Sequence, residues 1–205
     1  MHYEIGDILI FKVNRRDKEN IFQKIFAQLQ LIFDGKASHT EIITHYDAQT
    51  NTVTTLGSNS DGVKLRIWDI QDKNFAVGRL KGGVNQRKAL YVLEILESKY
   101  LGTEYSYRGL FNASINAIVE KFIPKIWKKK IIIKEKDKFF CSELVGEFIE
   151  LVDFNKKIST KYEKNISKYY LTPSDIYTSK DIMIIKDFGW YYEFARVELY
   201  TSVLI

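Results

Sequence analysis

Sulfur is scarce in this sequence. The 205 residues include one cysteine, Cys141, and two methionines. One thiol cannot form a disulfide within the chain, so the fold does not depend on an oxidising compartment and a reducing cytosol would keep the thiol active. A single cysteine is most often a small buried apolar residue. That interpretation stands beside the chemical one developed below.

Proline and long apolar runs are also scarce. Two prolines argue against extended proline-rich linkers, and no uninterrupted apolar run approaches the ~18 to 20 residues that cross a bilayer. The first residues lack a basic segment followed by an apolar segment, as a secretory signal would have. We therefore expect a cytoplasmic protein, although a trimmed signal would leave no trace.

Several motifs of cofactor and nucleic-acid proteins are absent. The sequence has no Cys/His cluster with metal-ligand spacing, no phosphate-binding glycine loop, and no zinc-finger or RRM signature. Its net charge of +5 is modest for 205 residues, a weak argument for nucleic acid. We expect no cofactor, no metal and no nucleic-acid partner; the oligomeric state is not specified.

The composition is that of a globular protein. Hydrophobic residues make up 45% and aromatic residues 14%, which is enough for a full core and for an apolar cleft. We therefore expect residues 1–205 to form a single domain.

The cysteine lies where an extended run turns into a helix. After it, apolar residues recur at helical spacing, at Leu144, Val145, Phe148, Ile149, Leu151 and Val152. Cys141 therefore falls in the first turn, where free N–H groups and the helix dipole lower the pKa of a thiol. The same N–H groups can bind an oxyanion. The pattern predicts Cys141 as a nucleophile, with Ser142 as a candidate substrate-binding neighbour.

Only three histidines can serve such a thiolate. His2 lies in the terminal tail and His45 lies next to a polar turn, where side chains are usually solvated. His39 begins a strand-like run, and the period-two rule places its side chain on the same face as Glu41. His39 is the candidate base, although a lone histidine is more often structural.

Periodicity predicts the remaining elements. These are strands at 8–11, 40–46, 52–56, 63–68, 75–80, 181–186 and 191–200, and helices over 21–33 and 85–100 with a short one after Thr172. The strands at 40–46 and 52–56 form a hairpin, and on the strand at 63–68 we expect Lys64 and Arg66 to point outward.

Short pieces in a fixed order carry a resemblance to a known family. They are GDILIF (6–11), SHTEII (38–43), DGV (61–63), VGRL (77–80), LGTEY (101–105), FCSELV (140–145) and LTPSDI (171–176). This series resembles the circularly permuted papain-like enzymes and, more closely, the YiiX/YaeF-like branch of the NlpC-type and lecithin:retinol acyltransferase-like superfamily. The resemblance runs from about residue 4 to residue 178.

The resemblance implies an α+β fold, with a curved antiparallel sheet packed against helices, and roles for individual residues. Cys141 matches the nucleophile and His39 the general base, while Tyr105 matches a tyrosine often found near the cleft. Many members carry Glu or His on the following strand to orient the imidazole, and here that strand has neither. The candidates for that position are Ser58 or Asn59, through a neutral hydrogen bond, and Glu41, on the histidine's own face.

The expected function is a cysteine-dependent hydrolase, a peptidase or amidase of the thiol protease type. Its substrate would be a peptide or peptidoglycan-like amide, or else a lipid ester or amide, and acyl transfer is a variant of the same chemistry. The alternative is a catalytically silent binding module on the same fold. A lysine-rich insertion at about 122–138 predicts either peripheral contact with an anionic membrane or a basic surface hairpin.

Overall fold

The computed structural model describes residues 2–12, 36–71, 74–109, 138–153, 158–159 and 168–188. In chain order its elements are β1 (Ile8–Lys12), β2 (Ala37–Asp47), β3 (Thr52–Asn59), β4 (Gly62–Asp69), β5 (Phe75–Leu80), α2 (Gln86–Tyr100), α4 (Cys141–Val152), the 3-10 turn η2 (Lys168–Tyr170), α5 (Pro173–Thr178) and β6 (Ile182–Lys186). The predicted helix over 21–33, the closing strand at 191–200 and all of the basic insertion except Lys138 lie outside the described residues.

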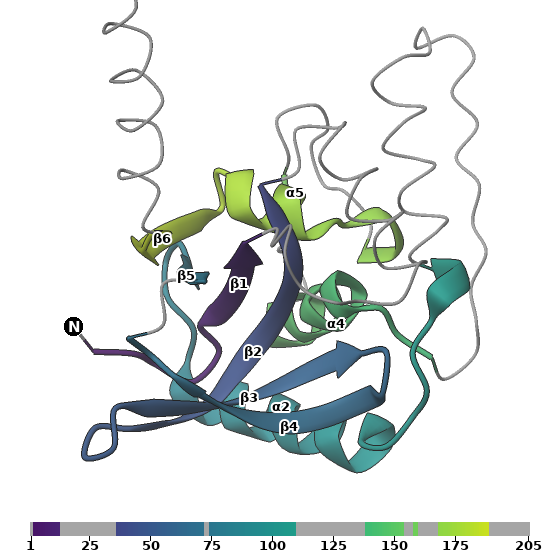
Figure 1. The fold of residues 1–205 in the computed structure, drawn as a ribbon, viewed down its shortest axis with the longest axis horizontal. Helices are drawn as coiled ribbons and strands as arrows, with labels where there is room; N and C mark the ends of the chain where they lie inside the picture. Colours follow the sequence, from purple (N-terminus) through teal and green to yellow (C-terminus); the bar gives the residue numbers. More distant parts are fainter. Residues whose placement is uncertain are drawn as a thin grey trace, which may run out of the picture.

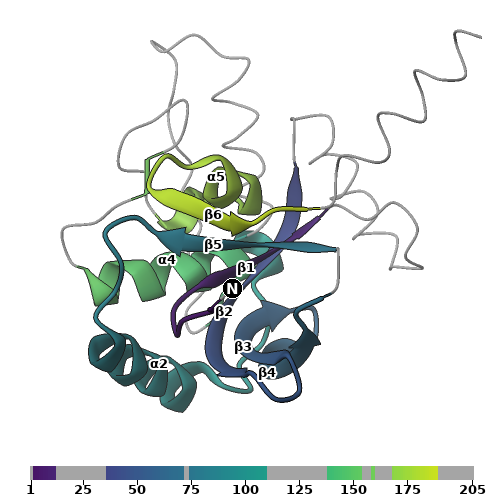
Figure 2. The same ribbon diagram turned by 90° about the vertical axis from the view of Figure 1, so that its left-hand side faces the viewer.

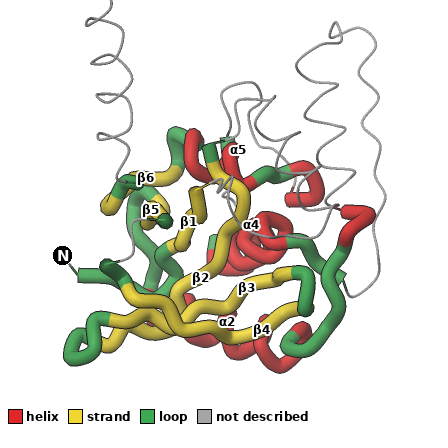
Figure 3. Tube along the Cα trace, in the orientation of Figure 1, coloured by secondary structure: helices red, strands yellow, loops and turns green. Residues whose placement is uncertain are grey.

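The fold is α+β and is built on one antiparallel sheet. Its six strands are in the order β4-β3-β2-β1-β5-β6, and helices α2, α4 and α5 cover one face (Figure 1, Figure 3). Figure 2 shows these helices stacked along the same side of the strands. The predicted strands and the three predicted helices that fall within the described residues are all present.

Alternation along the strands separates two apolar clusters. The larger one lies between the sheet and the helices and includes Ile8, Ile10, Ile42, Leu56, Ala76, Leu96, Leu144 and Phe148. The smaller one lies on the other face and comprises Tyr3, Leu9, Ile43, Val53, Ile70, Phe75 and Val77. The sheet curves around this smaller cluster and brings its two edge strands together. Lys186 at the end of β6 donates a hydrogen bond of 2.6 Å to the carbonyl of Ile70, just after β4.

Local signals account for the helix ends. The side chain of Asn85 accepts from the N–H of Lys88 and caps α2, and Gly102 follows the helix with a positive φ of 82°. Thr172 and Asp175 form a capping box at the start of α5. By contrast, no side chain caps α4 at Phe140.

One orientation prediction needs correction. Arg66 was expected to point outward, yet strand pairing sets it opposite Thr55, and its side chain approaches the buried Glu41. Leu65 and Ile67 are exposed instead, by 43% and 71%. The prediction is wrong for Arg66 because its side chain turns toward the buried carboxylate of Glu41, while this edge strand leaves apolar side chains exposed. Lys64 is exposed as expected.

A bulge determines the position of His45. Simple alternation would place His45 on the face of His39, but the register of β2 against β3 shifts between Ile43 and His45. The extra residue reverses the alternation. His45 is exposed, in agreement with the surface position that its proximity to the turn predicted.

Candidate active site

The segment leading into α4 occupies a split in the sheet. β2 and β3 pair only between Ile42–Asp47 and Thr52–Leu56, so the first half of β2 and the end of β3 diverge. The carbonyl of Phe139 accepts hydrogen bonds from Ser58 Oγ (2.7 Å) on β3 and from the N–H of Ser106 (3.0 Å). These contacts hold the start of α4 between the two strands.

Cys141 and His39 meet in this split. The Cys141 sulfur is hydrogen-bonded by the His39 ring and by the backbone N–H groups of Thr40 and Ser142. Cys141 is 2% exposed, whereas the side chain of His39 is 17% exposed. The thiol is therefore covered by protein, and the imidazole is the part of the pair that faces solvent.

The electrostatics favour a charged pair. Burial raises the pKa of the Cys141 thiol, but the positive charge and hydrogen bond of His39, with the two N–H groups, lower it below its ordinary value overall. Burial lowers the pKa of His39, but the thiolate and Glu41 outweigh this effect and raise it to about 10. Both shifts favour the form of the pair in which Cys141 is a thiolate and His39 an imidazolium.

Glu41 lies on the other side of the imidazole. Its Oε1 is 2.9 Å from His39 Nε2, and its side chain is fully buried. Burial raises the pKa of Glu41, but hydrogen bonds from His39, Thr55 and Trp68 lower it overall. Because Nε2 faces this carboxylate, Nδ1 is the ring nitrogen left for the sulfur.

Tyr105 also reaches the sulfur. Burial raises the pKa of Tyr105 well above 10, and the charge of Cys141 and a hydrogen bond to it raise it further. The hydroxyl is therefore a proton donor beside the thiolate at any neutral pH. Its ring packs edge-on against Tyr107, with ring centroids 4.9 Å apart.

Two of the predicted site residues have other partners. Ser58 was a candidate to orient His39, but its hydroxyl donates to Phe139 O, and Glu41 contacts the imidazole instead. Ser142 was a candidate substrate-binding residue, but its buried hydroxyl donates to the carbonyl of Leu171 at 2.5 Å. Only its backbone N–H faces the sulfur. Both side chains donate to main-chain carbonyls around the start of α4.

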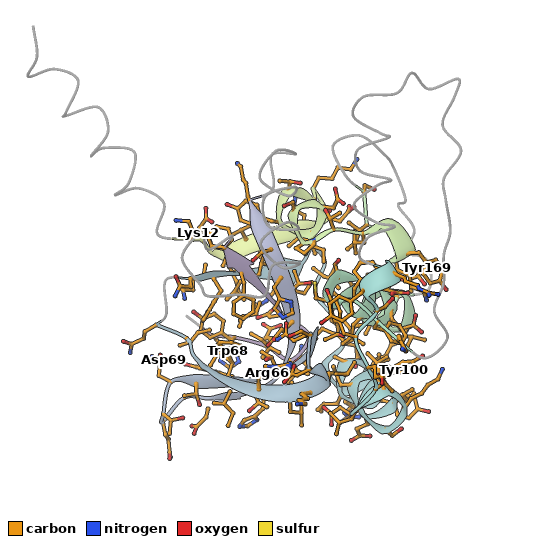
Figure 4. All side chains as sticks on the ribbon, turned by 45° about the vertical axis from the view of Figure 1, so that its right-hand side comes forward. Lys12, Arg66, Trp68, Asp69, Tyr100 and Tyr169 are labelled. Carbon is orange, nitrogen blue, oxygen red and sulfur yellow. The ribbon has the colours of Figure 1, made fainter. Side chains whose placement is uncertain are left out.

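Sequence reasoning missed two residues of the site, Thr55 and Trp68. Thr55 Oγ1 (2.5 Å) and Trp68 Nε1 (2.8 Å) both donate to Glu41 Oε2. Alternation within β3 and β4 placed each on a face, but the pattern carries no signal that the two strands lie beside Glu41. Figure 4 labels Trp68 and Arg66, which both lie on β4, the strand that pairs with β3.

Glycine at position 57 makes room for Glu41, so Gly57→Ala should disturb the imidazole. An added Cβ would lie 2.5 Å from Glu41 Cγ, too close for any real contact, and Glu41 has no exposed space to move into. We expect the Glu41–His39 hydrogen bond to be lost and the His39 pKa, measured by NMR titration, to fall by about one unit. Gly82→Ala is the control for general destabilisation, because its Cβ meets no atom within 4 Å but its positive φ of 88° strains the backbone away from Glu41. An unchanged His39 pKa in Gly57→Ala would contradict the prediction.

The described residues hold no group of three His, Cys, Asp or Glu side chains suited to a metal ion. His39 lies between Glu41 and Cys141 and contacts both, so these three side chains are engaged with one another.

Within the residues that the structure describes, no helix is long and apolar enough to cross a membrane.

Comparison with known proteins gives one informative result. No family model matches the chain, and no curated protein matches its sequence. The crystal structure of metalloprotein YiiX from Escherichia coli O157:H7 is similar, with a TM-score of 0.54 and 15% sequence identity over 90% of this chain and 97% of that chain. At this identity the similarity shows a shared fold, which agrees with the YiiX-like resemblance of the sequence.

Proposed function

We propose that this protein is a cysteine hydrolase of the permuted papain-like, NlpC-type class, acting on an amide or ester. The observation that carries the proposal is the hydrogen-bonded series Cys141, His39 and Glu41 at the start of an uncapped helix. A nucleophile, a base and a residue that orients the base are the parts that covalent acyl transfer requires.

The first half of the reaction forms a thioester. The Cys141 thiolate attacks the carbonyl carbon, a C–S bond forms, and the carbonyl π electrons move to oxygen. The N–H groups of Ser142 and Thr40 and the Tyr105 hydroxyl are the donors beside the sulfur for that oxyanion. The imidazolium of His39 then protonates the leaving amine or alcohol as its bond to carbon breaks.

The second half releases the acid. His39, now neutral, takes a proton from water, the hydroxide attacks the thioester carbon, and the thiolate leaves as His39 keeps the proton. The starting ion pair is restored, so no group is consumed. If an amine or alcohol replaces the water, the same steps give acyl transfer. Glu41 does not touch the substrate and is a positioning residue.

The substrate class follows from the nucleophile and from the aromatic surroundings of the site. Phe11 lies beside His39, with ring centroids 5.3 Å apart, and Tyr107 is exposed beside Tyr105. Such walls suit an amide in a peptide or peptidoglycan-like peptide, with a lipid ester or amide as the second class. YiiX is described as a metalloprotein. In this protein, the described residues include no group of three His, Cys, Asp or Glu side chains suited to a metal ion, and no step of the reaction uses one.

The second candidate is a catalytically silent binding module on the same fold. Its specific support is the 2% exposure of Cys141, because a nucleophile must be reached by its substrate. The charged pair opposes it, since a silent module has no need to hold a buried thiolate.

A two-stage assay separates these candidates. The first stage compares iodoacetamide labelling of Cys141 at pH 6 with labelling of free cysteine, scored by intact mass. The second stage measures turnover of peptide, peptidoglycan stem-peptide and lipid ester substrates by wild type and by Cys141→Ser. We expect labelling about tenfold faster than free cysteine and turnover that Cys141→Ser abolishes. Labelling no faster than free cysteine, or equal turnover by the variant, would reject the enzyme.

A further inference from the structure

The buried carboxylate of Glu41 divides its two oxygens between two tasks. Oε1 faces His39 Nε2 at 2.9 Å. Oε2 accepts two short hydrogen bonds, from Thr55 Oγ1 on β3 and from Trp68 Nε1 on β4. The orientation of the imidazole therefore depends on side chains from two strands that do not touch it.

A second set of contacts links Trp68 indirectly to His39. Its Nε1 also donates to Thr55 Oγ1 at 3.1 Å, so the two donors support each other. Its ring packs edge-on against Phe11, with ring centroids 4.8 Å apart, and Phe11 in turn packs against the His39 ring. The imidazole is thus held by the carboxylate on its edge and by an aromatic contact on its face.

We propose that Thr55 and Trp68 are positioning residues that keep Glu41 a fixed carboxylate directed at His39, and that they thereby set the lower pH limit of thiolate formation at Cys141. The proposal rests on the proposed function and deepens it. A buried carboxyl group without donors would take up a proton. A protonated Glu41 no longer stabilises the imidazolium, and the imidazolium is the charge that holds the thiolate.

Other charges around Glu41 are the same in every variant of the test. Arg66 Nη1 lies 3.7 Å from Oε1 and is itself paired with Asp61, which also pairs with Lys64. Cys141 adjoins His39, Tyr105 interacts with Cys141 and Glu143, and the neutral amide of Asn59 is 3.4 Å from Oε1. A difference between the variants below therefore reports the Thr55 and Trp68 hydrogen bonds.

Three exchanges test the proposal on the full chain. Thr55→Val removes the hydroxyl at nearly constant shape, Thr55→Ser retains it, and Trp68→Phe removes the indole N–H. Thr54→Val is the matched control, because Thr54 neighbours Thr55 but lies on the opposite face of β3. The probe is iodoacetamide, and the rate of Cys141 labelling is measured by intact mass from pH 4.5 to pH 9.

Loss of a donor raises the pKa of Glu41, so the acid limb of the labelling curve should move to higher pH. We expect Thr55→Val and Trp68→Phe to label about three- to tenfold more slowly than wild type at pH 5 and within about twofold at pH 8. Thr55→Ser and Thr54→Val should follow the wild-type curve.

Each contrary result has a separate meaning. If Thr55→Val and Thr55→Ser give the same curve, or if the loss is equal at every pH, the two residues are structural and the inference is overturned. If wild type labels no faster than free cysteine, the proposed function fails and the inference fails with it. Thermal unfolding checks each variant, and the Thr55 pair decides if Trp68→Phe does not fold.

Discussion

Replacing His39 by glutamine should lower turnover by about 10²- to 10⁴-fold, the usual contribution of a general acid and base. The same exchange should slow iodoacetamide labelling of Cys141 at pH 6 by about tenfold or more. Glutamine can still donate to Glu41, so the carboxylate is not left without its partner, but it carries no charge. The buried Cys141 thiol then has no positive charge beside it, and its pKa rises above the ordinary value.

The pH dependence gives the sign of this effect. In wild type the lowered pKa of Cys141 lets the thiolate form at a lower pH than in an ordinary thiol, and the pair persists until His39 loses its proton at about pH 10. The variant forms thiolate only as pH rises through the thiol's own raised pKa. The two labelling curves should therefore be far apart at pH 6 and approach each other near pH 10, the more so because low-pKa thiolates are weaker nucleophiles.

A second histidine on the same strand provides the control. His45 is exposed, and His45→Gln should leave both turnover and labelling at wild-type values. Equal labelling of wild type and His39→Gln at pH 6 would show that His39 does not activate the thiol.

Replacing Phe148 by alanine should lower the free energy of unfolding by about 3 to 5 kcal/mol, the range for deletion of a buried aromatic ring. Phe148 is fully buried on α4. Its ring lies against Gly6, where an added Cβ would be 2.9 Å from Phe148 Cζ, and Ala89 of α2 borders the same place. The ring therefore joins α4 to the N-terminal turn and to α2, and backbone on one side limits the collapse of the cavity.

Urea unfolding followed by circular dichroism measures this loss. Leu90→Ala is the control, since Leu90 is 43% exposed on α2 and its loss should cost about 1 kcal/mol or less. Because α4 carries Cys141 at its first turn, we also expect slower labelling of the thiol in Phe148→Ala. A loss below about 1 kcal/mol would show that the surrounding residues close the cavity.

Local periodicity was sufficient to predict features that depend on a single helix or strand. The 3.6-residue period predicted the helix after Cys141, and α4 begins at that residue. The period of two placed His39 and Glu41 on one face, and their 2.9 Å contact agrees. Both statements concern neighbours within a single element, where backbone geometry fixes the direction of each side chain.

The same rule failed where pairing between strands intervenes. Alternation predicted that Arg66 points outward, but the register opposite Thr55 turns it toward Glu41. A bulge removed His45 from the face of His39. The sequence made Ser58 a candidate to orient His39. The split between β2 and β3 instead brings the segment before α4 next to Ser58, whose hydroxyl donates to the carbonyl of Phe139.

The sequence by itself determined the chemical groups of this protein and their local setting: a thiol at the start of a helix, and an imidazole and a carboxylate on one face of a strand. The tertiary structure alone decided that these groups meet and that Thr55 and Trp68 hold the carboxylate. The physical reason is that the period of an element fixes where a side chain points along its own backbone. Which residue it points at depends on strand register and on the packing of the core between sheet and helices.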